Sequence, residues 1–211
     1  MKKVYLCVKR FLDIIFSIIL LIVLSPILLI VSIAIKIDSK GPVIFKQERI
    51  GKDGKVFKIY KFRSMVVGAE KIGTGVYSEK KDSRVTRVGK IIRATSIDEL
   101  PQLVNILKGE MSFIGPRPVL TYHPWKYEEY SEEQKKRFLL RPGITGLAQI
   151  NGRKQVDWEK RIKYDVEYVE KVNLWLDIKI TFITIYKVIF MKDNVNTGTT
   201  VKQKWKEEFV C

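Results

Sequence analysis

The longest uncharged run of the chain lies near its N-terminus. Residues 14–35 contain no charged side chain, and these 22 residues are enough to cross the hydrocarbon core of a bilayer as a helix. Ser25 and Pro26 lie at the midpoint of the run. Because proline removes a helical hydrogen bond and clashes with the preceding turn, the pattern predicts a kinked helix. A cleaved signal peptide is excluded, since the run is too long and no small-residue cleavage pattern follows it.

Basic residues lie on both sides of this run. Four Lys or Arg residues precede it, and nine more follow between residues 36 and 63. Cytoplasmic flanks of membrane segments carry positive charge of this kind. A kinked centre with two cationic ends therefore favours a helical hairpin that enters the inner leaflet and returns. A kinked helix that spans the membrane once fits these features equally well.

The pattern then changes to short extended runs. Residues 43–45 and 56–62 flank Asp53-Gly54, and Asp-Gly between such runs predicts a β-hairpin. The lysines of the second run form either a solvated face or a face that lies along anionic lipid headgroups.

Three later segments have helical patterns. Residues 122–140 predict a polar helix, and residues 158–172 predict a charged one. Residues 174–191 are apolar, with a stripe at helical spacing that comprises Trp175, Ile178, Phe182, Ile185 and Ile189. Such a stripe is typical of core packing and also of a helix that lies in the membrane interface.

The charge of the chain indicates a class of partner. The net charge is +16, from 39 basic and 23 acidic residues. This charge implies an anionic partner, which is a nucleic acid, a lipid surface or a phosphorylated small molecule. Cys7 and Cys211 lie at opposite ends, so no disulfide framework or cysteine metal site is expected. The single histidine, His123, excludes a histidine-rich zinc site and is expected to serve surface packing.

Asp98 and Glu99 are adjacent carboxylates at the predicted start of a helix that ends near Leu107. A helix N-terminus favours negative charge, because its first N–H groups lack partners and the macrodipole is positive there. Ser96 and Glu99 also have the spacing of a capping box, and Asp98 is itself a suitable cap. On this local pattern alone, capping is the simpler interpretation.

Five arginines lie in or beside turns: Arg87, Arg93, Arg117, Arg141 and Arg153. A guanidinium group binds phosphate oxygens bidentately, so arginines fixed by prolines and glycines predict a diphosphate pocket. Two neighbouring carboxylates beside such a pocket suit Mg²⁺, which often takes one or two carboxylates plus substrate phosphates. Adjacent helical positions point about 100° apart, so Asp98 and Glu99 are expected to differ in role. One attacks phosphorus and the other binds metal, and the spacing does not assign them.

Several ordered motifs resemble the bacterial sugar transferase family, whose members are small monotopic phosphoglycosyl transferases. These motifs are KRFLD (9–13), SP (25–26), FKIYKFRSM (57–65), SIDELPQ (96–102), MSFIGPRP (111–118), RPGITGLAQ (141–149) and NGR (151–153). The resemblance covers residues 7–190. The chain resembles the minimal catalytic form, without the multi-span region that precedes it in longer relatives.

The resemblance implies a reaction and a role for each motif. Enzymes of this family transfer a sugar 1-phosphate from a UDP-sugar to undecaprenyl phosphate, release UMP and initiate a surface-glycan pathway. By resemblance, Asp98 is the nucleophile that forms a covalent phosphosugar intermediate, and Glu99 binds Mg²⁺. The membrane helix is re-entrant and broken at Ser25-Pro26. The phosphate-binding candidates are Arg93, Arg117, Arg141 and Arg153.

The expected fold is α+β and mostly helical. It comprises a basic head and re-entrant membrane helix (1–40), a catalytic domain with a small β-hairpin and interfacial amphipathic helices (41–192), and a polar tail (193–211). The expected location is the inner face of the bacterial cell membrane. The expected partners are a UDP-sugar, undecaprenyl phosphate and membrane lipid, with no nucleic acid. The sequence specifies neither the sugar nor the oligomeric state.

Two rival hypotheses remain open at this point. In the first, the chain is a non-catalytic basic adaptor that binds anionic lipid, and its carboxylates have no catalytic role. In the second, the chemistry is the same but Glu99 is the attacking group.

Overall fold

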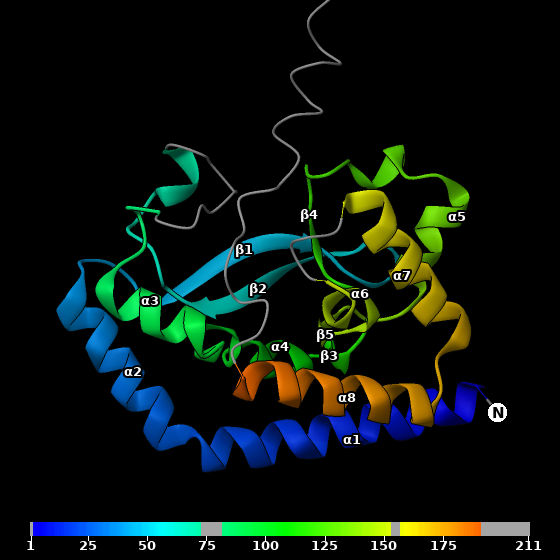
Figure 1. The fold of residues 1–211 in the computed structure, drawn as a ribbon, viewed down its shortest axis with the longest axis horizontal. Coiled ribbons are helices and arrows are strands. Elements are labelled where there is room, and N and C mark those ends of the chain that lie inside the picture. The colour runs from blue at the N-terminus through cyan, green and yellow to red at the C-terminus, as the bar shows by residue number, and fades with distance from the viewer. Residues whose placement is uncertain (1, 73–81, 153–156, 191–211) are drawn as a thin grey trace, which may run out of the picture.

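The computed structural model of the protein describes residues 2–72, 82–152 and 157–190 (Figure 1). Three helices lie along one side of the molecule, and two small sheets with the other helices lie above them. The three are α1 (Lys2–Val23), α2 (Ser25–Asp38) and α8 (Leu174–Ile189). The described residues therefore have the expected α+β, mostly helical architecture.

α1 and α2 are bent by 63° relative to each other at Leu24. The hydroxyl of Ser25 donates to the carbonyl of Ile22 at 2.8 Å. In a regular helix that carbonyl would accept from residue 26, but Pro26 has no N–H. The kink predicted at Ser25-Pro26 is confirmed. Within the described ranges, no single helix is long and apolar enough to cross a membrane, whereas the bent pair together has the necessary length and composition.

A buried carboxylate on α8 fastens α1 to the rest of the fold. Asp177 accepts from the hydroxyl of Tyr5 at 2.5 Å, from the ammonium of Lys9 at 2.6 Å and from the hydroxyl of Tyr168 at 2.8 Å. Tyr168 belongs to α7 (Trp158–Lys171). Asp177 therefore joins three helices, and these donors compensate the cost of burying its charge.

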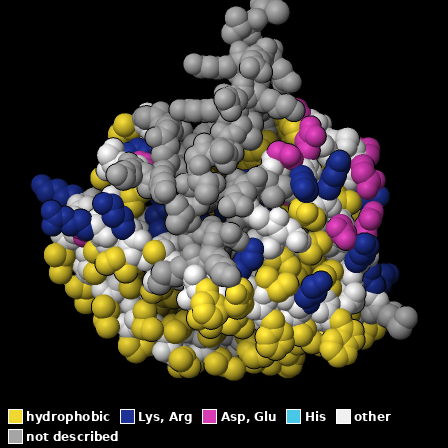
Figure 2. Space-filling model, in the orientation of Figure 1, with side chains coloured by type: hydrophobic (Ala, Val, Ile, Leu, Met, Phe, Trp, Pro, Cys, Tyr) yellow, Lys and Arg dark blue, Asp and Glu magenta, His cyan; other side chains and the backbone are white. Residues whose placement is uncertain are grey.

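The aromatic stripe of α8 faces outward. Trp175 is 78% exposed and Phe182 is 70% exposed, and Ile185 and Ile189 are also exposed. Core packing is therefore the wrong explanation of this stripe. Figure 2 shows apolar side chains gathered along the side of the molecule formed by α1, α2 and α8. Contiguous apolar surface of this kind marks an interaction site.

The predicted β-hairpin is confirmed. β1 (Ile44–Ile50) pairs antiparallel with β2 (Val56–Phe62), and β4 (Val119–Leu120) pairs with the other edge of β1. Asp53 and Gly54 both have positive φ, 55° and 76°, as a type I′ turn requires. The right-handed twist of the strands favours this turn, which explains the strength of the Asp-Gly signal.

The side chain of a helical residue completes the outer edge of β2. Asn105 lies on α4 (Gln102–Leu107), accepts from the N–H of Tyr60 at 2.9 Å and donates to the carbonyl of Lys58 at 2.8 Å. A neighbouring strand would satisfy the same two backbone groups. Asn105 thus docks α4 on the hairpin, where its neighbours on the helix pack against Phe57 and Ile59.

Two turns contain Arg-Pro, one at residues 115–118 and one at residues 141–143, and their backbones are in direct contact. β3 (Ser112–Ile114) pairs in parallel with β5 (Gly143–Thr145), and each strand adjoins one of the turns. A Cβ at Gly115 would lie 2.4 Å from the carbonyl oxygen of Arg141, and one at Gly143 would lie 2.1 Å from the nitrogen of Gly115. Glycine is therefore required at both positions, because only its missing side chain permits this approach.

Residues 122–140 do not form the predicted single helix. They form short turns at Tyr127–Glu129 and Lys136–Leu139 and a one-turn helix, α5 (Glu132–Lys135). Tyr130 has extended backbone angles, and its buried ring packs edge-on against Phe138 at 5.2 Å. This packing interrupts the helix, and Ser131 restarts it as an N-cap.

The remaining elements are α3 (Arg87–Ala94), α6 (Leu147–Ile150) and short 3₁₀ turns at Lys52–Gly54, Ala69–Lys71 and Ile97–Glu99. α2 ends at Asp38. The expected polar tail, 193–211, lies outside the described residues.

Candidate active site

Asp98 and Glu99 lie in a tight turn, not in a capped α-helix. α3 ends at Ala94, Ser96 takes the left-handed conformation with φ of 59°, and the 3₁₀ turn Ile97–Glu99 leads into α4. The Ser96 side chain makes no capping hydrogen bond, because this backbone conformation is not the extended one of an N-cap. The capping-box interpretation is therefore wrong. The C-terminal end of α4 at Leu107, followed by Gly109 with φ of 83°, agrees with the prediction.

Lys61 on β2 binds one member of the acidic pair. Its ammonium lies 2.7 Å from Oε1 of Glu99, and both side chains are about one-fifth exposed, at 21% and 22%. Lys58, by contrast, is exposed on the opposite face of the hairpin. The lysines of β2 therefore do not form one solvated face, because Lys61 points toward the carboxylates.

The carboxyl group of Asp98 is perturbed by burial. Burial raises the pKa of Asp98 from 3.8 to about 6, and the neighbouring Glu99 adds to the rise. Lys61 and Arg93 oppose the rise, because positive charge favours the carboxylate. A carboxyl group with a pKa near neutrality is typical of functional sites.

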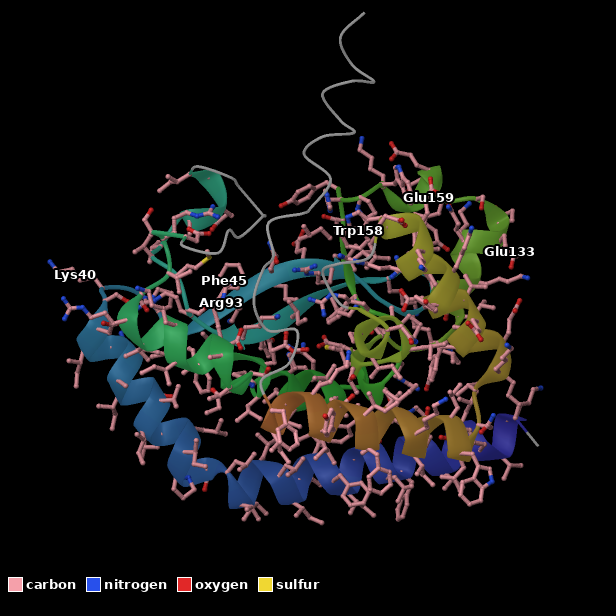
Figure 3. All side chains as sticks on the ribbon, in the orientation of Figure 1. Lys40, Phe45, Arg93, Glu133, Trp158 and Glu159 are labelled. Atoms are coloured by element: carbon pink, nitrogen blue, oxygen red, sulfur yellow. The ribbon has the colours of Figure 1, made fainter. Side chains whose placement is uncertain are left out.

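Arg93 lies close enough to Asp98 for its charge to act on that carboxyl group. It occupies the last turn of α3, and its charge lowers the pKa of Asp98. The N-terminus of α3 is fixed by Thr86, whose hydroxyl accepts from the N–H of Gly89 at 3.0 Å. Asp38 at the end of α2 also accepts from the N–H of Val88 at 2.9 Å. The helix that presents Arg93 is therefore fastened directly to α2 (Figure 3).

Arg117 is held through its backbone. Its N–H donates to Asp165 at 3.3 Å, and its carbonyl accepts from Arg137 at 2.9 Å. Asp165 and Arg137 are both fully buried and paired with each other. The two prolines that flank Arg117 were expected to stiffen this turn, and the buried ion pair behind the turn fixes it further.

Arg49 is a site residue that the motif analysis did not single out. Burial lowers the pKa of Arg49 from 12.5 to about 10, the nearby charge of Arg117 lowers it further, and Tyr122 and Glu99 act in the opposite direction. Arg49 pairs with Phe57 across the hairpin and Lys61 pairs with Phe45, so both cations lie on the same face of the two strands. The sequence did contain a signal for Arg49. The Asp53-Gly54 turn fixes the pairing of the two strands, and alternation of side chains along them then puts Arg49 and Lys61 on one face.

The predicted phosphate ligand Arg141 makes a hydrogen bond at the end of a helix. The Nε of Arg141 donates to the carbonyl of Gly109 at 2.7 Å, at the C-terminal end of α4. The structure therefore places Arg141 at a helix end, where cations stabilise the last carbonyls. Arg153 lies outside the described residues.

The described residues contain no group of three or more His, Cys, Asp or Glu side chains that could hold a metal. Asp98 and Glu99 offer two carboxylates, and Lys61 already engages one oxygen of Glu99. Two carboxylates are enough to bind Mg²⁺ only where substrate phosphate oxygens and water supply the other ligands of the ion.

His123, the single histidine, has a packing role, as expected. Its ring lies edge-on to that of Trp158, with ring centroids 5.3 Å apart.

Comparison with known proteins identifies the family. A family model described as bacterial sugar transferase matches residues 4–191. A UDP-glucose:undecaprenyl-phosphate glucose-1-phosphate transferase of Klebsiella pneumoniae is 50% identical over 184 residues, which are 85% of this chain and 39% of the relative. Galactosyl transferase CpsE of Streptococcus agalactiae serotype III (strain NEM316) is 43% identical over 89% of this chain and 43% of its own length.

A third relative is similar in length to this chain. The uncharacterized sugar transferase EpsL of Bacillus subtilis (strain 168) is 43% identical over 93% of this chain and 95% of its own length. The chain thus spans about two fifths of the first two relatives and nearly all of the third. Since the family model covers almost the whole chain, this protein belongs to the bacterial sugar transferase family.

Proposed function

We propose that the protein is a phosphoglycosyl transferase. It transfers a sugar 1-phosphate from a UDP-sugar to undecaprenyl phosphate, releases UMP and thereby initiates synthesis of a lipid-linked surface glycan. One observation carries the proposal: the pair Asp98-Glu99 lies among the cations Lys61, Arg93 and Arg49. Arg117 lies beside Arg49. The printed name of the Klebsiella relative describes this transfer for glucose 1-phosphate.

The reaction has two displacements at one phosphorus atom. A carboxylate oxygen of Asp98 attacks the sugar-linked phosphorus, an Asp98–phosphorus bond forms and the bond from phosphorus to the UMP oxygen breaks. An oxygen of the lipid phosphate then attacks the same phosphorus and releases Asp98. In-line transfer of this kind depends mainly on positioning and charge neutralisation, which Lys61 and the arginines supply.

A bound Mg²⁺ would supply further neutralisation of charge on the phosphate oxygens. Glu99 is the proposed protein ligand, with Asp98 beside it. Lys61 holds the carboxylate of Glu99 in place at 2.7 Å.

The soluble donor and the lipid acceptor meet where the site adjoins the apolar helices. Leu20 and Leu21 of α1 pack against the cluster of Phe57 and Leu103, directly behind β2 and α4. We propose that α1 and α2 enter the inner leaflet as a re-entrant pair and that α8 lies in its interface. The protein would then be monotopic, on the inner face of the cell membrane.

The test is an assay of UMP release with undecaprenyl phosphate, Mg²⁺ and a panel of UDP-sugars. Wild-type protein is expected to release UMP with one or a few donors. Asp98→Asn is expected to lose release at least about a thousandfold while it stays bound to membranes. Full turnover by Asp98→Asn would contradict the nucleophile assignment.

The rival hypotheses give different results. A basic adaptor would release no UMP, and Asp98→Asn and Glu99→Gln would leave its lipid binding unchanged. If Glu99 attacks, a trapped phosphosugar adduct would map to Glu99. The ion pair with Lys61 favours a supporting role for Glu99, because one of its oxygens is already engaged.

A further inference from the structure

The guanidinium of Arg49 is tethered at both of its terminal nitrogens. Nη2 donates to Oε1 of Gln47 at 2.6 Å, and Nη1 donates to the carbonyl of Pro118 at 3.3 Å. Gln47 lies two positions earlier on β1 and therefore on the same face of the strand. Pro118 directly follows Arg117. Arg49 thus bridges the hairpin and the Arg-Pro turn in one fixed orientation.

This guanidinium lacks a balancing charge in direct contact. Neither Arg49 nor Arg117 forms an ion pair with a carboxylate in the part of the chain that the structure describes. The Nε of Arg49 is buried and makes no hydrogen bond there. Two neighbouring guanidinium groups repel each other, so a bound anion between them would remove an unfavourable interaction and gain two favourable ones.

The position of Arg49 indicates which anion it would bind. Arg49 precedes Ile50, which packs with Val119 and Tyr130 at one end of β1. α2 packs at the opposite end of the hairpin, around Ile44 and Phe62. Arg49 therefore lies at the end of the hairpin opposite to α2, away from the apolar helix pair and on the side from which a water-soluble substrate would come.

We propose that Arg49 and Arg117 form an anion site for the phosphate of the departing nucleoside monophosphate and that Gln47 is the residue that positions Arg49. The inference rests on the proposed function. As the bond from Asp98 to phosphorus forms, the electron pair of the breaking phosphorus–oxygen bond passes to the nucleotide phosphate. That phosphate gains negative charge, and the guanidinium pair stabilises it.

The test measures binding, independently of turnover. UMP and uridine are titrated by calorimetry into the protein of 211 residues in detergent micelles. Wild-type protein is expected to bind UMP at least about tenfold more tightly than uridine, because only UMP carries the phosphate. Arg49→Gln is expected to weaken UMP binding by about tenfold or more and to leave uridine binding unchanged.

Gln47→Met tests the positioning role, since methionine matches the length of glutamine without its hydrogen-bond acceptor. It is expected to weaken UMP binding about threefold to tenfold at unchanged stoichiometry. A merely structural defect would lower the fraction of binding-competent protein and leave the dissociation constant unchanged. The matched control is Lys58→Ala, which removes the same charge from the exposed opposite face of the hairpin and should change UMP binding less than about twofold.

Unchanged UMP affinity in Arg49→Gln would overturn the inference, as would equal affinity of the wild-type protein for UMP and uridine. A weakening in Lys58→Ala equal to that in Arg49→Gln would also overturn it, because general electrostatics would then account for the effect. Tight UMP binding through Arg49 without UMP release from any UDP-sugar would refute only the proposed function. Turnover with unchanged UMP affinity in Arg49→Gln would refute only the anion site.

Discussion

At the level of single residues, Asp98 is held in an environment that opposes its ionised form. Partial burial removes water from the carboxylate, and Glu99 adds a second negative charge beside it. The cations Lys61 and Arg93 offset these effects only in part, so the pKa of Asp98 stays near 6. A nucleophile in this state is ionised at neutral pH and poorly solvated, which favours attack on phosphorus.

The same environment predicts that Asp98 lowers the stability of the fold. The pKa of Asp98 rises from 3.8, its value without burial, to about 6 in the folded state. The folded state therefore binds the proton more tightly, and stability falls as pH rises from about 4 to above 6. Asp98→Asn is expected to raise the unfolding free energy at pH 8 by on the order of 2 kcal/mol. Chemical denaturation at several pH values measures this difference, which should fall to about a third of its full size near pH 4.5 and vanish only below the unfolded-state pKa of 3.8.

The pH dependence of UMP release is a separate prediction from the same group. Attack requires the ionised carboxylate, and the pKa of Asp98 is about 6. The rate under saturating donor is expected to level off above pH 7 and to fall about tenfold by pH 5. Initial rates between pH 5 and pH 8.5 provide the measurement. A rate that stays level down to pH 4.5 would contradict the raised pKa.

At the level of elements, the hairpin and α4 position the site together. β2 presents Lys61, β1 presents Arg49, and the turn before α4 presents the acidic pair. Asn105 connects these elements, since its amide binds both β2 backbone groups that face α4 and also donates to Glu110 at 2.7 Å. The relative position of the cations and the carboxylates therefore depends on one buried side chain.

This connection makes Asn105→Asp a severe substitution. The new carboxylate oxygen would face the carbonyl of Lys58 and the carboxylate of Glu110, where the amide nitrogen now donates to both. We expect a loss of about 3 kcal/mol or more of unfolding free energy, because the oxygen that replaces the amide nitrogen would be buried without a donor and next to two acceptors. The control is Asn151→Asp, since the amide of Asn151 is exposed and makes one bond, to Leu147. Thermal unfolding should separate the two variants by several degrees, and equal melting temperatures would refute the role assigned to Asn105.

At the level of the whole molecule, local sequence signals predicted the main elements of the fold, whereas they predicted only some residues of the candidate site. Pro26 predicted the kink, and Asp53-Gly54 predicted the hairpin. Each was a reliable signal because it imposes a backbone geometry without contacts from distant residues. Arg141 matched an Arg-Pro motif but caps a helix end, and Arg49 matched no motif but lies beside Arg117. These outcomes depend on tertiary contacts, which a residue's neighbours in sequence do not encode.

The outward apolar face formed by α1, α2 and α8 leads to a prediction about membrane topology. The 63° bend at Leu24 and the outward position of Lys40 beyond the end of α2 (Figure 3) suit a re-entrant pair whose two ends lie on the same side of the membrane. Single cysteines at Lys3 and Lys40, in a chain with Cys7 and Cys211 replaced by serine, should both react with a membrane-impermeant maleimide only from the cytoplasmic side. Pro26→Ala restores the missing helical bond and is expected to straighten the pair into a spanning helix, so that the two labels move to opposite sides in part of the population. If the cysteines at positions 3 and 40 reacted from opposite sides of the membrane in the chain that retains Pro26, the bent pair would cross the membrane and the re-entrant topology would be wrong.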